Sequence, residues 1–272
     1  MKRGFTLVEL LTAIVIAVII GAALLSLFIV GNRTFGSNRD VSQLTESARN
    51  ALTTLEFVFS RWGFGVPCSN NNCDVSSVPV PDCGSYPPSD PMCLTVSTNG
   101  VEFYASLYGM GFVTSVGDGQ TRIISCRLSS DDRKNCYYVW RNQGIANWNG
   151  SGTPPVYQLP TINEVSCIES FSPNLTLNGV QLSSSNNSSQ ISLSAGNLII
   201  RVPHKISIYL SNGWLMMDRT DMAGGCNENE SAVRLARASD FKVEKAGRGV
   251  KLEITFVSEG GRNVKVVRYF GR

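Results

Sequence analysis

Histidine is almost absent from this sequence, and charged residues are scarce. The 272 residues include one histidine, and 17% are Asp, Glu, Lys or Arg, against about 25% in an average soluble domain. One histidine excludes metal sites built from several histidines and argues against histidine-dependent catalysis. The formal net charge of +3 excludes a strongly basic coat for nucleic acid. The hydrophobic fraction of 43% excludes disorder of the whole chain.

Signatures of catalysis are also lacking. The sequence contains no Gly-x-Ser-x-Gly, Gly-x-x-x-x-Gly-Lys or His-x-x-x-His pattern. We therefore expect a protein that is not an enzyme and that needs neither a cofactor nor a metal. Asp118 between two glycines and the pair Asp131-Asp132 could supply calcium ligands, but acidic residues in turns are more often turn formers. His204, after Pro203, is interpreted as a histidine at a strand edge.

Residues 10–32 lack any ionisable side chain, and only Thr12 and Ser26 interrupt the apolar run over residues 10–30. As a helix this run is about 31 Å long, which matches the hydrocarbon core of a bilayer. A cleaved secretory leader is the alternative. However, its small-residue site at Gly21 and Ala23 would be followed by more apolar residues, whereas signal peptides end their apolar segment before the cut.

Glu9 places a carboxylate at the front of this apolar segment. An acidic residue deep in a bilayer costs about 2.5–3.5 kcal/mol on insertion scales, so it favours a cationic partner. The sequence after Glu9 offers no Lys or Arg before Arg33. Two interpretations remain: Glu9 lies at the headgroup level, or its partner comes from another molecule or from a new chain terminus.

Residues 2–11 (KRGFTLVELL) resemble the N-terminal signature of type IV prepilins and pseudopilins. The resemblance implies that a prepilin peptidase cuts between Gly4 and Phe5, that Phe5 becomes N-methylated, and that Glu9 pairs with the terminal amine of a neighbouring subunit. The carboxylate and the amine are each costly in apolar surroundings when they are unpaired. Only one axial stagger between subunits pairs them, so the pair would select that stagger.

The same resemblance implies a location and a set of partners. Before assembly the chain would cross the bacterial inner membrane once, with its head in the periplasm, and it would then enter a pilus or pseudopilus. Its partners would be the prepilin peptidase, other minor pilins or pseudopilins, and the major subunit, all but the peptidase through the N-terminal helix.

The expected fold is α+β and pilin-like, with a long N-terminal helix on an antiparallel sheet. After the leader, residues 1–4, we predict one helix over residues 5–62. Its residues 5–30 form the membrane span or filament core, and residues 31–62 are amphipathic, with apolar residues three or four positions apart. A Cys- and Pro-rich insert follows over residues 63–93, and an enlarged β-rich head over residues 94–272.

Eight cysteines lie beyond the apolar run, which predicts an oxidising compartment and up to four disulfides. Zinc is a weak rival, because no Cys-x-x-Cys occurs. We favour pairs within the insert, and Cys126 with Cys136. The candidates are Cys68, Cys73, Cys83, Cys93, Cys126, Cys136, Cys167 and Cys226.

The end of the predicted helix, residues 59–65 (FSRWGFG), resembles PilW-type minor pilins and the J-type minor pseudopilins of type II secretion. The resemblance implies a minor subunit that helps to initiate or cap a filament, beneath or beside its tip. Two alternatives remain open: a tip adhesin or DNA-binding minor pilin, and a minor pseudopilin of a secretion system. The C-terminal basic set for DNA capture would be Arg262, Lys265, Arg268 and Arg272, although a solvated strand face is the simpler interpretation.

Overall fold

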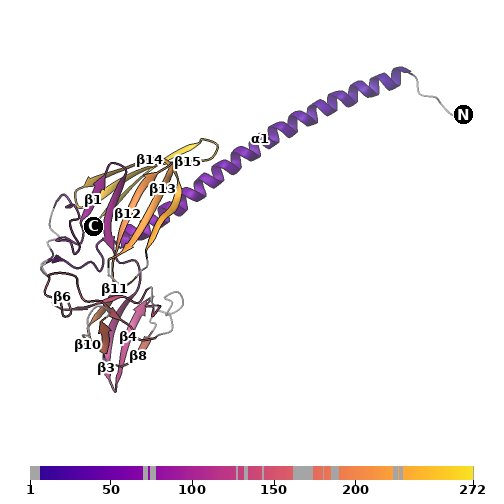
Figure 1. Cartoon of the computed structure of the whole chain (residues 1–272). Coiled ribbons are helices and arrows are strands. Elements are labelled where there is room, and N and C mark those ends of the chain that lie inside the picture. The colour runs from indigo at the N-terminus through magenta and orange to yellow at the C-terminus, as the bar shows by residue number, and fades with distance from the viewer. Residues whose placement is uncertain are drawn as a thin grey trace.

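The structure, a computed structural model, describes residues 7–69, 73, 78–126, 128–131, 134–142, 144–161, 174–179, 181–184, 190–222, 226 and 229–271. A single long helix, α1 (Leu7–Ser60), leads into a head built from two antiparallel sheets (Figure 1). The helix projects far beyond the head at its N-terminal end. This architecture confirms the predicted α+β class with a long N-terminal helix and a β-rich head.

The first sheet packs against the C-terminal half of α1. All its neighbouring strands are antiparallel. In order across the sheet they are β1 (Leu94–Ser97), β2 (Gly100–Ala105), β12 (His204–Ser211), β13 (Trp214–Asp221), β14 (Glu230–Ala246), β15 (Gly249–Val257) and β16 (Asn263–Gly271).

The amphipathic part of α1 supplies one wall of the main core. Phe59 is the centre of this contact, because its ring stacks on Phe103 of β2 at 4.7 Å and on Phe270 of β16 at 4.5 Å between centroids. Burying a large apolar side chain contributes about 1.5–3 kcal/mol, so this stripe fixes the helix on the sheet. Its buried residues are Leu44, Ala48, Ala51, Leu55, Val58 and Phe59.

The second sheet has a hydrophobic core of its own, which contains no residue of α1. In order, its strands are β10 (Gln190–Ser192), β9 (Gln181–Ser184), β7 (Tyr157–Gln158), β5 (Tyr137–Arg141), β11 (Leu198–Arg201), β3 (Met110–Gly117), β4 (Gln120–Cys126) and β8 (Asn174–Asn178), with β6 (Gly144–Ile145) paired to β5. We call this part of the head the second lobe. The sequence pattern did not reveal that the head is divided between two sheets.

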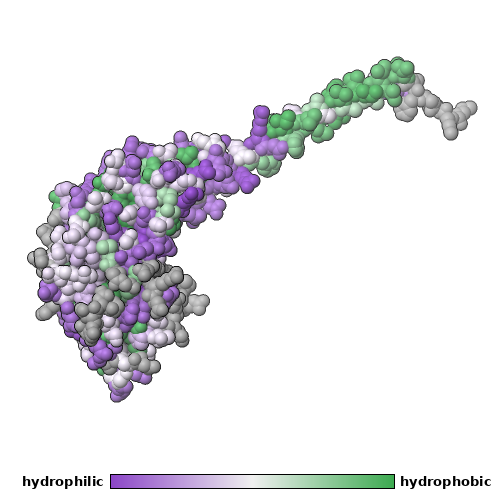
Figure 2. Space-filling view, viewed as in Figure 1, coloured by the Kyte–Doolittle hydropathy of each residue, from purple (hydrophilic) through white to green (hydrophobic). Residues whose placement is uncertain are grey.

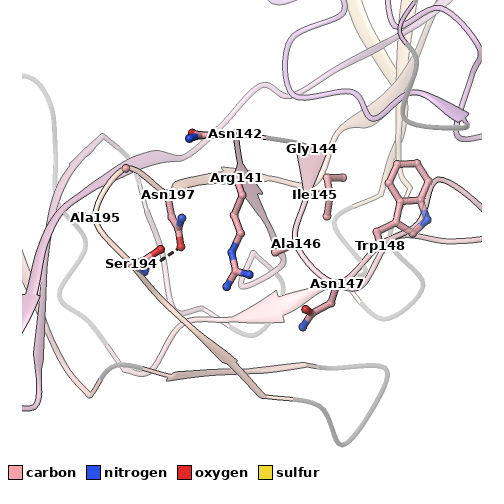
Figure 3. Close-up of a pocket in the computed structure, with 11 residues that line it drawn as sticks. Arg141, Asn142, Gly144, Ile145, Ala146, Asn147, Trp148, Ser194, Ala195 and Asn197 are labelled. Carbon is pink, nitrogen blue, oxygen red and sulfur yellow. Dashed lines mark hydrogen bonds between the residues drawn. The ribbon is translucent and has the colours of Figure 1, made fainter.

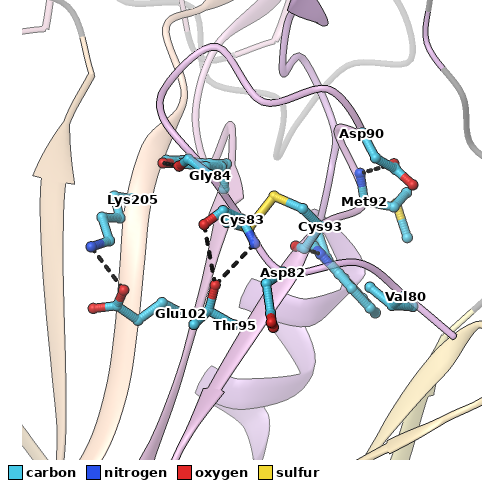
Figure 4. Close-up of a disulfide and its surroundings, with 12 residues drawn as sticks. Val80, Asp82, Cys83, Gly84, Asp90, Met92, Cys93, Thr95, Glu102 and Lys205 are labelled. Atoms are coloured by element: carbon cyan, nitrogen blue, oxygen red, sulfur yellow. Dashed lines mark hydrogen bonds and ion pairs between the residues drawn. A yellow bond between two sulfur atoms is a disulfide. The ribbon is translucent and has the colours of Figure 1, made fainter.

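The insert closes one edge of the first sheet. The Cys83–Cys93 disulfide holds the segment beside β1, where the backbone N–H of Leu94 donates to Pro81 O at 2.8 Å (Figure 4). Thr95 adds a bond, since its hydroxyl accepts from the N–H of Cys83 at 2.9 Å. An uncovered edge strand would offer unpaired backbone groups to other chains, so the insert protects this edge.

Candidate functional site

The N-terminal half of α1 is apolar on all sides and touches nothing in the head. From Leu7 to Val30 the large hydrophobic side chains are 49% to 75% exposed. Figure 2 shows this segment as a continuous hydrophobic rod, in contrast with the hydrophilic surface of much of the head. Among the described residues, α1 is the one helix long and apolar enough to cross a membrane.

Glu9 lies in the first turn of α1, at the far end of this rod from the head. Its backbone carbonyl accepts a hydrogen bond from the Thr12 hydroxyl at 3.0 Å. The helix dipole favours a carboxylate near a helix N-terminus, and Glu9 occupies such a position. The predicted cleavage residues Gly4 and Phe5 lie outside the described residues.

The head forms hydrogen bonds with α1 shortly after the apolar rod ends. The Asp40 carboxylate accepts from the Ser258 hydroxyl at 2.9 Å and from the N–H of Gly260 at 3.3 Å. The Arg262 guanidinium donates to the hydroxyl of Ser37. A Cβ at position 260 would displace the Asp40 carboxylate from its present position. The turn between β15 and β16 therefore holds the helix about 10–15 Å beyond the apolar run.

Three disulfides are present among the described cysteines. Two lie within the insert, Cys68–Cys73 and Cys83–Cys93. The third joins Cys136 to Cys226 across 90 residues. The prediction that Cys136 pairs with Cys126 is therefore wrong, and the reason is tertiary: Cys136 directly precedes β5 of the second lobe, whereas Cys226 lies between β13 and β14 of the first sheet. The side chain of Cys126 and all of Cys167 lie outside the described residues.

Buried charges also join the two sheets. Arg201, the last residue of β11, forms an ion pair of 3.3 Å with Asp221, the last residue of β13, and both side chains are 1% exposed. His204 is fully buried in an edge-to-face contact with Tyr108. It is the first residue of β12, as its interpretation as a histidine at a strand edge allows, but β12 is an interior strand that is paired on both sides. A buried ion pair disfavours any arrangement that separates its partners.

The insert contacts the second lobe through two tyrosines, of which Tyr138 is buried and Tyr86 is partly buried. The hydroxyls of Tyr86 in the insert and Tyr138 in β5 lie 3.0 Å apart. Burial raises the pKa of the Tyr86 hydroxyl well above its ordinary value, and it also raises the pKa of Tyr138. Both groups are therefore held neutral, because the folded protein disfavours their ionised forms.

We expect alkali to weaken the protein through this pair. A group with a raised pKa contributes full stability below its unfolded pKa, about 10 for tyrosine, and this contribution is lost as the pH rises above that value. Each tyrosine adds at most about 1.4 kcal/mol per pH unit to the decline in the free energy of unfolding. Urea unfolding of the full chain in detergent from pH 8 to 11.5 measures it. Tyr86→Phe should flatten the decline of the free energy of unfolding with pH, whereas Tyr269→Phe, at an exposed tyrosine, should not. Equal slopes for Tyr86→Phe and the wild type would contradict the assignment of this decline to the tyrosine pair.

The C-terminal basic set is largely engaged within the protein. Lys265 lies 2.7 Å from Glu253, and Arg268 lies 3.6 Å from Glu56 of α1. Hydrogen bonds from Lys251 and Lys265 lower the pKa of Glu253 to about 2. These contacts favour the interpretation as a solvated strand face over DNA capture. Arg272 lies outside the described residues.

Among the described residues, the candidate cation ligands do not come together, and Asp132 lies outside the described residues. Asp118 and Gly119 form the turn between β3 and β4 with φ of 53° and 71°, which is turn chemistry. Within the described part of the chain, no three His, Cys, Asp or Glu side chains are grouped so that they could hold a metal ion.

Residues 1–25 match the family described as the prokaryotic N-terminal methylation motif. A protein of Aquifex aeolicus (strain VF5), described as uncharacterized, is 26% identical over 276 residues, which cover 96% of this chain and 95% of the relative. No solved structure matches the chain.

The matched motif is the type IV prepilin signal, and it supports assignment of the chain to the type IV pilins and pseudopilins. The protein is pilin-like, because it combines a prepilin motif, a long apolar helix and a disulfide-bonded β-rich head. The motif implies processing by prepilin peptidase and assembly with other pilins. Motif and helix together fit a single-pass inner-membrane protein with a soluble head. Pilin-like proteins are generally structural, not enzymatic.

Proposed function

We propose that this protein is a minor pilin or pseudopilin that helps to initiate or cap a type IV pilus-like filament. The leader, residues 1–4, is removed after Gly4, and Phe5 becomes the methylated N-terminus. The apolar half of α1 anchors the chain in the inner membrane and later packs in the filament centre. There the amine of a neighbouring minor or major subunit pairs with Glu9. The protein has no catalytic role in this proposal.

The observation that carries the minor role is the second lobe. It has a core separate from the one that α1 enters and extends the head beyond the first sheet (Figure 1). A repeating subunit must pack the same head above and below itself at every step, and a projecting lobe obstructs such stacking. A position at one end of the filament leaves room for it. Because Glu9 is proposed to pair with the amine of a neighbouring subunit, we place this subunit beneath or beside the tip, where such a neighbour is at hand.

The Glu9 carboxylate needs a cationic partner, which a filament interior provides. Its helix half is apolar all round, and an ionised carboxylate in such surroundings is stable only with a paired and hydrogen-bonded partner. An N-terminal amine from an adjacent, staggered helix satisfies this requirement. The same geometry would serve a pilus or the pseudopilus of a type II secretion system.

The abundance of the chain tests its minor role. In purified filaments we expect it at far lower copy number than the major subunit, together with siblings that carry the same leader. Deletion of the chain should lower the number of filaments but leave the composition of those that remain. Quantitative mass spectrometry of filaments from both strains measures this, and the same spectra report whether the mature chain begins with methylated Phe5. Equal copy number with the major subunit would contradict the proposal.

A further inference from the structure

The second lobe carries a polar hollow that the assembly function does not use. The hollow has a volume of about 580 Å³, within the usual range for ligand pockets. It lies between the end of β5, the turn after β6 and the turn before β11, and no residue of α1 lines it. A second hollow of about 640 Å³ adjoins it and shares Asn147 and Trp148. We call the two together the Trp148 groove.

Trp148 supplies an aromatic surface between the two hollows. Its side chain is partly buried and packs against the hydrophobic cluster around Cys136 and Cys226. Its indole N–H donates to Ser151 O at 2.9 Å, which fixes the orientation of the ring. Since Trp148 lines both hollows, the rest of the ring is available to a ligand. The electron-rich face of such a ring attracts the weakly positive C–H groups of a sugar ring.

Arg141 supplies a positive charge in the same groove. Figure 3 shows its side chain reaching across the middle of the hollow, with Asn147 and Trp148 on one side and Ser194 and Asn197 on the other. One guanidinium nitrogen donates to Ser192 O at 3.0 Å, which holds the exposed side chain in place. No carboxylate forms an ion pair with it in the part of the chain that the structure describes. Its other N–H donors match the geometry of a carboxylate.

The polar lining is held in position before any ligand arrives. Asn147 adopts a left-handed φ of 58°, which few non-glycine residues adopt, and its amide donates to the Tyr157 hydroxyl at 3.2 Å. The buried Asn197 accepts from the N–H of Ser194 at 3.0 Å and so closes the facing turn. A site whose side chains are ordered beforehand loses less entropy on binding.

We propose that the Trp148 groove binds an acidic saccharide, with a sugar ring stacked on Trp148 and its carboxylate bound by Arg141. A single arginine among amide and hydroxyl side chains suits a saccharide, which carries many hydroxyl groups and few charges. A nucleic-acid backbone would require several cations along its path. This site extends the adhesin alternative and does not depend on the assembly role, which uses the opposite end of the molecule.

Titration of the full chain in detergent with tetragalacturonate tests the proposal, and isothermal calorimetry and saturation-transfer NMR provide the readouts. The matched control ligand is the methyl-esterified tetramer, which keeps the sugar rings and removes the charges. We expect saturable binding of the acid form and at least about tenfold weaker binding of the ester, because a hydrogen bond between charged groups is lost. No binding of the acid form, or equal binding of both forms, would overturn the proposal.

Three variants locate the site. Arg141→Gln removes the charge from an exposed side chain and should weaken binding about 10- to 100-fold. Trp148→Leu keeps an apolar side chain against the Cys136–Cys226 cluster but removes the ring, and should also abolish most binding. Arg248→Gln alters another exposed arginine, in the turn between β14 and β15, and should have no effect. Tetragalacturonate binding that is unchanged in Arg141→Gln would overturn the proposal. The filament assays above are independent of all these results.

Discussion

Replacement of Glu9 by alanine is expected to leave membrane insertion intact and to reduce incorporation into filaments by more than about 100-fold. The variant keeps the apolar rod of α1, so the anchor is unaffected. Under the proposed pairing, it leaves the amine of the neighbouring helix buried without its carboxylate. Loss of one member of a buried ion pair costs about 3–5 kcal/mol, which is equivalent to at least two orders of magnitude in association.

The measurement is the ratio of the chain in sheared filaments to the chain in carbonate-washed membranes. Glu46→Gln is the matched control, because Glu46 is an exposed carboxylate on the same helix beyond the membrane span. It should assemble normally. If Glu9→Ala were incorporated at the wild-type ratio, the role of Glu9 in subunit pairing would be refuted.

Removal of the Cys136–Cys226 disulfide is expected to cause the largest loss of stability in the head. This bridge closes a sequence separation of 90 residues, for which the chain-entropy relation gives about 4.5 kcal/mol. The bridge also joins the second lobe to the segment that precedes β14. Its loss should therefore loosen the second lobe against the first sheet.

The double variant Cys136→Ala/Cys226→Ala measures this effect by urea unfolding and by limited proteolysis. Cys68→Ala/Cys73→Ala is the matched control, because the same chemistry closes a separation of only 5 residues. Its expected cost is about 2 kcal/mol. Proteolysis should cut between the sheets in the first variant only. A smaller loss for Cys136–Cys226 than for Cys68–Cys73 would contradict the expected role of the long bridge.

Some features were predictable because their causes lie within a few consecutive residues. The helix follows from an unbroken apolar run and then a stripe at spacings of three and four. The pair Asn212-Gly213 is a local hairpin signal, and it joins β12 to β13 with φ of 50° and 76°. Both values lie in the left-handed region that asparagine and glycine tolerate best, so two consecutive residues account for this turn.

Other features escaped prediction because their causes are distant in sequence. The 17-residue strand β14 was not predicted as a strand, and its sequence is rich in charged and small residues. It is nevertheless a central strand, since β13 and β15 pair with its two sides, with register shifts on each. Backbone pairing with neighbours, not local propensity, determines its conformation.

The Trp148 groove was missed for the same reason. Its sides come from residues 141–148 and 194–197, which are far apart in the chain and carry no recognisable motif. Trp148 and the asparagines of this region resemble an ordinary surface loop in the sequence. Only the pairing of β5 with β11 brings the two segments to the same end of the second lobe.

The sequence by itself predicted the membrane anchor, the position of the Glu9 carboxylate at its front and the presence of disulfides, because each depends on composition or on spacing along one helix. The tertiary structure decided that the head has two sheets, that Cys136 pairs with Cys226, and that Arg201 meets Asp221 in the interior. These features are contacts between residues far apart in the chain. Such contacts form only when burial and strand pairing repay the entropy of closing the intervening loop, and no local pattern records that balance.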